Sequence, residues 1–281
     1  MTDTHAPGDI PPAQSLSPAP SRRQILVHGL KGAALTGVVA GSGLLAAPSG
    51  FSVSPAMAGT IPTTLSDKDR SMTPKAFVYT EVQIAVPFEQ APWKAINQAI
   101  LQQPGFLNKT WFAGSGTNSL GGIYAFDSIS NAEAFVTGYF PREAAGFGVA
   151  HTTRIFDAAA TQEASRDLAS PHFGARPTTA PGAFVYTELQ VNMPFPQVPW
   201  QDRNPVLRAQ KGLLSKTWLS GLHTGTIGGV DAFDTLENAK DFAVNVFPET
   251  AARMNAALYT RVFDAAAIEA ASREMRSPYY V

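Results

Sequence analysis

The chain has 281 residues, of which 44% are hydrophobic and 15% charged, and this is the composition of an ordinary globular protein with one or two domains. Its net charge of −1 at pH 7 provides no field that would attract nucleic acid or an anionic membrane surface. The absence of cysteine excludes disulfides, thiol nucleophiles, iron–sulfur clusters and cysteine zinc sites.

The beginning of the chain has the pattern of an export signal. Residues 1–20 are rich in Pro, Ser, Ala and Thr and lack an apolar period, which predicts disorder. The pair Arg22 and Arg23 then precedes a weakly apolar run, rich in Gly and Ala, at residues 32–47. This order resembles a twin-arginine signal peptide and predicts recognition by the twin-arginine translocation machinery.

A small-x-small cleavage site follows at Ala56 and Ala58. Cleavage after Ala58 would release a periplasmic or secreted protein. The alternative is a retained membrane anchor, but the apolar run is shorter than the roughly 20 strongly apolar residues that a spanning helix needs. We therefore expect no stable membrane insertion after cleavage.

The rest of the chain contains one sequence unit written twice. The stretch Gly105–Asp127, GFLNKTWFAGSGTNSLGGIYAFD, matches Gly212–Asp234, GLLSKTWLSGLHTGTIGGVDAFD, at an offset of 107 residues. A long ungapped repeat indicates two copies of one small domain. The predicted divisions are the disordered start and signal (1–58), a polar lead-in (59–74), unit 1 (75–169), a proline-rich linker (170–182) and unit 2 (183–281).

Within unit 1, strand and helix patterns alternate in a fixed order. Alternation with β-branched residues predicts strands, and apolar residues at helical spacing predict helices. In chain order the predicted elements are a strand at 77–84, a helix at 93–103, strands at 106–113 and 122–126, a helix capped by Asp127 or Ser128, and a strand at 150–156. The order β-α-β-β-α-β is that of a ferredoxin-like unit, with an antiparallel sheet and both helices on one face.

Such a unit leaves one face of its sheet uncovered, and a second unit in the same chain can cover it. The predicted fold class is therefore α+β: tandem ferredoxin-like β-α-β-β-α-β repeats packed sheet to sheet as an intramolecular dimeric α/β barrel. The chain would be a pseudo-dimer by itself, and further association between chains stays open.

The motif residues of unit 1 resemble a known family. They are Pro104-Gly105-Phe106-Leu107, Lys109, Trp111, Gly121-Gly122-Ile123-Tyr124 and Phe126. This pattern is similar to that of the YdhR-like monooxygenases of the dimeric α/β-barrel superfamily, in which one unit per chain forms a homodimer. The resemblance implies a cofactor-independent reaction, and hence no cofactor, although the superfamily also contains isomerases, haem-handling proteins and binders.

A polar spot is expected in the aromatic space between the two sheets. The apolar side of the first strand suits the helices, so Tyr79, Glu81 and Gln83 are predicted to face inward, together with Lys109, Trp111 and Arg154. In this setting Glu81 would have a raised pKa and abstract a proton, while Lys109 or Arg154 would hold the developing oxyanion. The remaining candidates are His151 as a base and, as ligand-binding residues, Tyr79, Trp111, Tyr186, Glu188, Lys216, Trp218 and Arg261.

A structural interpretation of these residues stays open. The charged residues can form buried ion pairs that align the two sheets, and both tryptophans can serve as packing residues. No histidine spacing matches a zinc motif, so no metal site is expected, and no haem motif is present. The two units also differ, with Tyr124 matched by Asp231 and Gly146 by Arg253, which predicts that their cavities have diverged.

Three functions are compatible with these patterns. The leading hypothesis is an exported cofactor-independent monooxygenase that acts on a small aromatic or polyketide-like compound in the barrel lumen. The alternative is a non-catalytic small-molecule binding or carrier protein of the periplasm. A third is an assembly module that pairs through exposed sheet edges.

Overall fold

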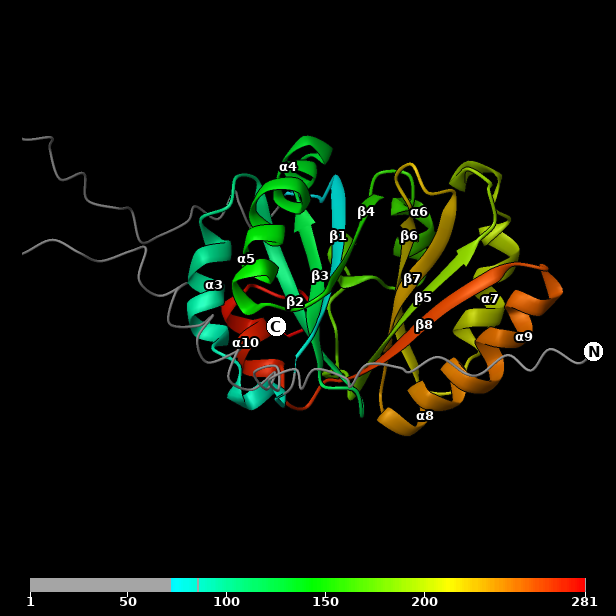
Figure 1. Cartoon of the computed structure of the whole chain (residues 1–281). Coiled ribbons are helices and arrows are strands. Elements are labelled where there is room, and N and C mark those ends of the chain that lie inside the picture. The colour runs from blue at the N-terminus through cyan, green and yellow to red at the C-terminus, as the bar shows by residue number, and fades with distance from the viewer. Residues whose placement is uncertain (1–71, 85, 281) are drawn as a thin grey trace, which may run out of the picture.

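The computed structural model describes residues 72–84 and 86–280 (Figure 1). The predicted signal peptide, with Arg22, Arg23, Ala56 and Ala58, lies outside the described residues, as does most of the lead-in. In the described part of the chain both units have the predicted order β-α-β-β-α-β, and each is followed by a short helical arm.

The elements of the two units correspond one to one. Unit 1 and its arm contain β1 (Ala76–Gln83), η1 (Phe88–Gln90), α3 (Trp93–Leu101), β2 (Phe106–Gly114), β3 (Ser119–Phe126), α4 (Ile129–Ala134), η2 (Phe135–Tyr139), α5 (Phe140–Phe147), β4 (His151–Asp157), α6 (Gln162–Asp167) and η3 (Pro171–Phe173). Unit 2 and its arm contain β5 (Ala183–Gln190), η4 (Phe195–Gln197), α7 (Trp200–Arg208), β6 (Leu213–Ser220), β7 (Thr226–Phe233), α8 (Leu236–Asp241), η5 (Phe242–Val246), α9 (Phe247–Arg253), β8 (Ala257–Asp264) and α10 (Glu269–Glu274).

The second helix of each unit begins at a capping side chain and contains a π-helical turn. The hydroxyl groups of Ser128 and Thr235 accept hydrogen bonds from the backbone N–H three residues later, which satisfies an otherwise unpaired helix-end donor. The π-helical segments η2 and η5 interrupt these helices at the same place. Such turns widen a helix locally and are frequent at functional sites.

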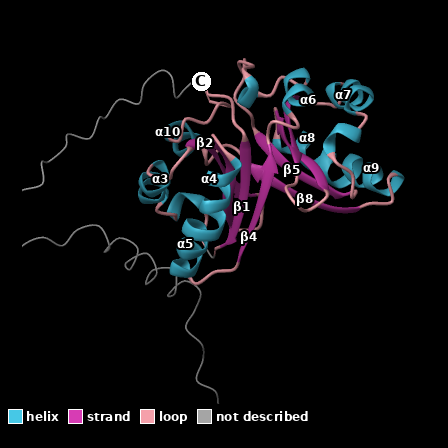
Figure 2. Ribbon diagram, turned by 90° about the horizontal axis from the view of Figure 1, so that it is seen from above, coloured by secondary structure: helices cyan, strands magenta, loops and turns pink. Residues whose placement is uncertain are grey.

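The strands form one eight-stranded sheet in the order β4-β1-β3-β2-β8-β5-β7-β6. All its pairings are antiparallel, and the helices lie on the outer sides of the two halves (Figure 2). The halves join where Gly114 of β2 pairs with Phe263 of β8. At the matched position on the opposite side, Phe156 of β4 bridges Gly221, directly after β6. The predicted α+β fold, with two ferredoxin-like units packed sheet to sheet, is confirmed.

Aromatic rings fill the space between the two halves of the sheet. Tyr79 and Tyr186 stack with ring centroids 4.0 Å apart, and Phe112 stacks on Phe263 at 4.4 Å. All four side chains are buried, and stacked pairs of this kind add to the hydrophobic effect. In the described part of the chain the lumen is therefore a packed aromatic core, where the sequence had predicted a ligand cavity.

Each unit's arm packs on the other unit. The backbone N–H of Lys216 in β6 donates to the carbonyl of Leu168 in the arm of unit 1, at 3.1 Å. Reciprocally, Lys109 N–H in β2 donates to the carbonyl of Met275, after α10, at 3.0 Å. These bonds occupy the free edge of each strand and bind the two units together.

The linker also takes part in the core. His172 and Phe173 are buried, and the His172 ring lies edge-on to Phe77 with centroids 4.9 Å apart. Burial lowers the pKa of His172 to about 3, so its ring stays neutral. The beginning of the predicted linker is thus part of the packing between the units.

Candidate functional site

The main cavity of unit 2 lies between its sheet and its helices, and has a volume of about 440 Å³. Its walls come from β5, β6 and β7 on one side and from α7, η5 and α9 on the other. This volume is within the range of about 300–1,000 Å³ that is usual for small-molecule sites. The lining is apolar or glycine except for five polar side chains, which are those of Thr187, Arg203, Lys216, Thr250 and Arg253.

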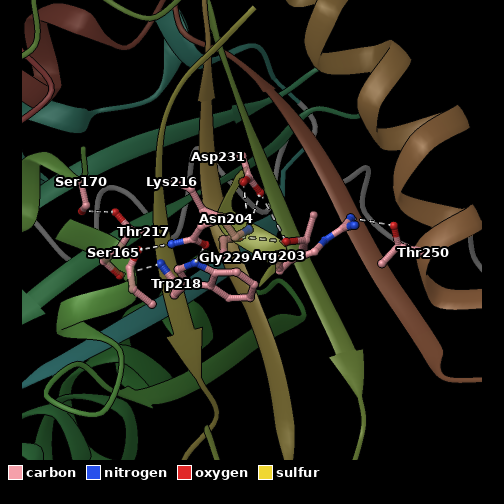
Figure 3. Close-up of polar contacts among 12 residues, drawn as sticks. Ser165, Ser170, Arg203, Asn204, Lys216, Thr217, Trp218, Gly229, Asp231 and Thr250 are labelled. Carbon is pink, nitrogen blue, oxygen red and sulfur yellow. Dashed lines mark hydrogen bonds and ion pairs between the residues drawn. The ribbon is translucent and has the colours of Figure 1, made fainter. Parts of the chain in front are cut away.

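A buried ion pair forms the sheet side of this cavity. The Lys216 Nζ donates to both carboxylate oxygens of Asp231, at 2.9 and 3.0 Å (Figure 3). Both side chains are almost fully buried, and Lys216 lines the cavity while Asp231 lies behind it. Gly229 of β7 makes room for the lysine, because a Cβ atom there would collide with its Nζ.

Burial raises the pKa of Asp231, although Lys216 and the hydroxyl of Thr187 favour the charged carboxylate. The aspartate therefore retains some tendency to take up a proton even beside a lysine. The buried pair of Asp231 and Lys216 can hold the ammonium group of the lysine in a fixed position at an otherwise apolar wall.

Trp218 is held beside this pair by side chains from two directions. Its indole Nε1–H donates to the side-chain oxygen of Asn204 in α7 at 2.9 Å, and its backbone N–H donates to Ser165 of the arm of unit 1 at 2.9 Å (Figure 3). Asn204 in turn donates to the carbonyl of Ala164 at 2.9 Å. The arm of unit 1 thus fixes one wall of the cavity of unit 2.

Two arginines contribute from the helix side. Arg203 of α7 and Arg253 of α9 both donate to the hydroxyl of Thr250, at 2.9 and 3.2 Å. Burial, followed by the repulsion of Arg253, lowers the pKa of Arg203, and Asp231 acts in the opposite direction. A guanidinium group stays charged in proteins despite such shifts, so two cations meet at one hydroxyl.

Unit 1 has only a remnant of this cavity, with a volume of about 30 Å³. The rings of Tyr124 and Tyr139 occupy the place where unit 2 has Asp231 and Val246. Lys109 remains, fully buried, and its Nζ makes no hydrogen bond to any described residue. The Nζ lies 2.8 Å from the ring centroid of Trp111, and burial holds its pKa well below the usual value of 10.5.

The predicted orientation of Lys109 and Trp111 toward the lumen is wrong. Both side chains line the small cavity between the sheet and the helices of unit 1. Lys216 and Trp218 have the same orientation in unit 2. In the register with β3, Lys109 lies opposite Tyr124 and Trp111 lies opposite Gly122. A shift of register in β2, between Phe106 and Asn108, precedes them. Because Thr110 and Phe112 take the lumen side instead, the predicted site separates into two regions.

The charged residues that do lie at the lumen form ion pairs between the units. Arg261 donates to Glu81 at 2.6 Å, and Arg154 donates to Glu188 at 3.4 Å. The hydroxyls of Tyr79 and Tyr259 also donate to Glu81, at 2.8 and 3.0 Å. On the other side, Tyr186 donates to Glu188 at 2.6 Å.

These contacts argue against the predicted rise in the pKa of Glu81. Burial acts to raise this pKa, but hydrogen bonds from Arg261, Ser119 and Tyr79 outweigh it and leave the pKa lowered. An ionised glutamate held by an arginine and two tyrosines aligns the sheets. This geometry favours the structural interpretation of Glu81, Glu188, Arg154 and Arg261.

The histidines do not converge on the cavity. His151 is exposed at the start of β4, with its ring 5.6 Å from that of Phe140. Across residues 72–84 and 86–280, no three His, Asp or Glu side chains are grouped as a metal site would require. Over the same residues, no helix has the length and apolar character needed to cross a bilayer.

Sequence reasoning placed Lys216 and Trp218 at a site but missed Arg203, Thr250 and Asp231. A signal for them existed in the differences between the units, because the matched residues in unit 1 are Ile96, Glu143 and Tyr124. Asp231 and Arg253 stood out as differences without any role being assigned. The missing information was that Arg203 and Thr250 line the same cavity as Lys216, and that Asp231 lies behind this lysine on the sheet side.

Several solved structures are distantly similar to the chain. A putative monooxygenase from Lactobacillus acidophilus NCFM aligns with a TM-score of 0.36 and 5% identity, covering 67% of this chain and 93% of that chain. An anthrone oxidase-like protein gives a TM-score of 0.43 and 13% identity, covering 67% and 90%. A putative monooxygenase from Fusobacterium nucleatum gives 0.38 and 8%, covering 69% and 93%. At these values the likenesses do not bear on function.

Comparison by sequence is more specific for unit 1. No curated protein matches the chain. Residues 80–166, from within β1 to within α6, match the family model described as "Putative mono-oxygenase ydhR". Over residues 80–166 the chain thus carries a domain of the YdhR mono-oxygenase family.

Proposed function

We propose that the protein is a cofactor-independent monooxygenase whose substrate, a small aromatic or polyketide-like compound, binds in the cavity of unit 2. The family match supports a monooxygenase-like function and a small-molecule ligand. The observation that carries the choice of site is the apolar cavity of about 440 Å³ with the ammonium group of Lys216 at its sheet side. The lumen between the sheets, by contrast, is filled by stacked rings.

The proposed chemistry begins with ionisation of the substrate. The Lys216 ammonium, oriented by Asp231, lowers the pKa of a substrate hydroxyl placed beside it, because a nearby positive charge favours the anion. The proton leaves to water through the cavity opening. The apolar walls strengthen this attraction because they exclude solvent around the charges.

The electron-rich anion then reacts with O₂. For a bicyclic phenol such as naphthol, one oxygen atom enters the ring as a new quinone carbonyl and the other leaves as water. The substrate supplies all four electrons, so the reaction needs no further reductant. In this scheme Lys216 is the catalytic residue, and Asp231, which does not line the cavity, is a positioning residue.

Oxygen uptake with naphthol, phenol and hydroxyanthracene tests the proposal on the mature chain. We expect Lys216→Met to reduce turnover by roughly 100-fold, the scale of removing one charged group that stabilises a reacting anion. Asp231→Asn should affect the pH profile of turnover more than substrate affinity. Lys211→Met removes an exposed charge outside the cavity and is the matched control.

Lys216→Met leaves Asp231 buried without its partner, which is expected to destabilise the fold, so the double variant Lys216→Met/Asp231→Leu keeps the experiment informative. Turnover equal to wild type in this folded double variant would rule out the cavity as the reaction site. Failure of the wild type to turn over any of the three compounds would favour the second candidate function.

The second candidate is a non-catalytic carrier of a hydrophobic small molecule. It is favoured by the fact that the charge of Lys216 is already balanced by Asp231 within the protein. Native mass spectrometry of protein purified from the exported fraction would detect a retained ligand. An empty protein that also binds none of the test compounds would argue against this function.

We further propose that residues 1–58 direct export through the twin-arginine machinery, which would place the mature chain in the periplasm or outside the cell. The motive is the Arg22-Arg23 pair followed by the small-x-small site at Ala56 and Ala58. Substitution of both arginines by lysine should retain the protein in the cytoplasm. An N-terminus other than Gly59 in the exported protein would contradict the cleavage site.

We also propose that the chain acts as a pseudo-dimer, in which the two units take the place of the two subunits of a homodimer. The reciprocal arms and the two matched junctions of the sheet support it. Sedimentation of the mature chain should show a monomer. A stable dimer would indicate that further association contributes to function.

A further inference from the structure

The helix side of the cavity in unit 2 carries two positive charges close together. Arg203 and Arg253 come from different helices, line the cavity and donate to the same acceptor, the hydroxyl of Thr250. Two like charges that share one acceptor repel each other; burial lowers the pKa of Arg203, and the repulsion of Arg253 lowers it further. An arrangement of this kind is stabilised when an anion binds between the two groups.

The protein itself supplies little negative charge to these arginines. Among the described residues, Arg203 has no ion pair with a carboxylate, and Arg253 has only an exposed contact of 3.6 Å with Glu249. Asp231 is already engaged by Lys216 on the sheet side. The three cationic side chains that line the cavity therefore exceed the nearby carboxylates.

The fold does not require this pair of arginines. At the matched positions unit 1 has Ile96 in place of Arg203 and Gly146 in place of Arg253, with Glu143 in place of Thr250. Unit 1 nevertheless forms the same helices on the same sheet. The two arginines are therefore present in the unit that has the open cavity, and the fold forms without them in the other unit.

We infer that the cavity of unit 2 binds an amphipathic anion, with a flat apolar body between the walls and a carboxylate or similar acidic group at Arg203 and Arg253. This inference rests on the proposed function, because it specifies the ligand of the same cavity. Under that function the substrates are hydroxylated aromatic acids, whose hydroxyl group lies at Lys216 on the sheet side and whose acidic group meets the arginines on the helix side. A guanidinium pair suits a planar acid because it offers several N–H donors in a fixed geometry.

Two fluorescent probes distinguish the contribution of the ligand's charge to binding from that of its apolar body. Anilinonaphthalene sulfonate and the neutral N-phenylnaphthylamine share nearly the same aromatic skeleton, and only the first is an anion. We expect Arg203→Ile, which installs the residue of unit 1, to weaken sulfonate binding by roughly 10-fold, the equivalent of losing one charge-assisted hydrogen bond. Binding of the neutral probe should change by less than about twofold, since the apolar walls that hold its body are kept.

Two further variants control for structure. Arg203→Lys keeps the charge and should keep most of the preference for the sulfonate. Lys211→Gln removes an exposed charge outside the cavity lining and should change neither affinity. The double variant Asp231→Tyr/Val246→Tyr, which installs the two rings of unit 1, should abolish binding of both probes.

The outcomes distinguish the inference from the function on which it rests. If the filling variant abolishes binding but Arg203→Ile weakens both probes equally or neither, the anion site is wrong and the cavity proposal survives. If the filling variant still binds both probes as the wild type does, the probes bind elsewhere and the cavity itself fails as the site. A loss limited to the sulfonate in Arg203→Ile, together with loss of both probes on filling, supports both.

Discussion

The two cavities of this protein have the same scaffold and differ more than tenfold in volume, at about 440 Å³ in unit 2 and about 30 Å³ in unit 1. In both units a tryptophan of the second strand donates to an asparagine of the first helix, at 2.9 Å in each case. In both, a serine from the other unit's arm accepts from that tryptophan's backbone N–H, at 3.0 and 2.9 Å. The matched residues are Trp111, Asn97 and Ser272 for unit 1, and Trp218, Asn204 and Ser165 for unit 2.

The difference in volume thus comes from a few side chains and not from the backbone framework. Two tyrosine rings fill unit 1, and an aspartate and a valine leave unit 2 open. The same exchange decides whether the lysine of the second strand has a partner. Asp231 pairs with Lys216, whereas Lys109 has no hydrogen-bond partner among the described residues. A duplicated domain can therefore keep one copy as a packed scaffold while the other acquires a ligand site.

The strongest test of this contrast makes the same substitution at the two matched lysines. Lys216→Met leaves the carboxylate of Asp231 buried without its partner, which is expected to lower the free energy of unfolding by about 3–5 kcal/mol. Urea unfolding followed by circular dichroism would measure the loss. A loss below about 1 kcal/mol would show that water or another group replaces the lysine.

Lys109→Met is expected to have the opposite sign. It replaces a buried amine that lacks a hydrogen bond by an apolar side chain of similar length, so the free energy of unfolding should rise by about 1–3 kcal/mol. The same urea titration, with the exposed Lys211→Met as control, measures the gain. If Lys109→Met destabilises the protein as much as Lys216→Met does, the proposed contrast between an unpaired Lys109 and a paired Lys216 is wrong.

The effect at Lys109 should depend on pH with a defined sign. Burial holds the pKa of this amine in the folded protein well below its usual 10.5. At pH values between the pKa of the folded protein and that of the unfolded chain, the unfolded chain binds one proton more than the folded protein does. Stability of the wild type therefore rises with pH in this window, by at most about 1.4 kcal/mol per pH unit. The advantage of Lys109→Met should be smaller at about pH 9 than at about pH 7, and an unchanged advantage would mean that Lys109 is protonated in the folded state.

The smallest expected difference lies between the two ion pairs at the lumen. Glu81 receives several short bonds from Arg261, whereas Glu188 has a single contact of 3.4 Å from Arg154, whose side chain is 41% exposed. Glu81→Gln should cost about 1–2 kcal/mol and Glu188→Gln less than about 1 kcal/mol, since solvent screens the second pair more. Thermal unfolding measures both losses, and equal losses of stability in Glu81→Gln and Glu188→Gln would contradict the expected difference between the two ion pairs.

Much of the fold could be predicted because its signals are local and occur twice. The alternation of the first strand correctly placed Tyr79 and Glu81 toward the other unit, since Val78 and Val82 on its opposite face are purely apolar. On the second strand both faces mix polar and apolar residues, so periodicity could not choose between them. The register with β3 makes that choice, and it turns Lys109 toward the helices.

The sequence by itself determined the duplicated β-α-β-β-α-β order, the family motifs of unit 1 and the list of positions at which the two units differ. Only the tertiary structure decided that the lumen is packed with rings and that the open cavity lies under the helices of unit 2. The physical reason is that strand periodicity is a property of neighbours in the chain, whereas a cavity is the volume left over when side chains from distant elements pack together. Lys216 and Arg203 line the same cavity because strand and helix face each other there, and no spacing in the sequence expresses that proximity.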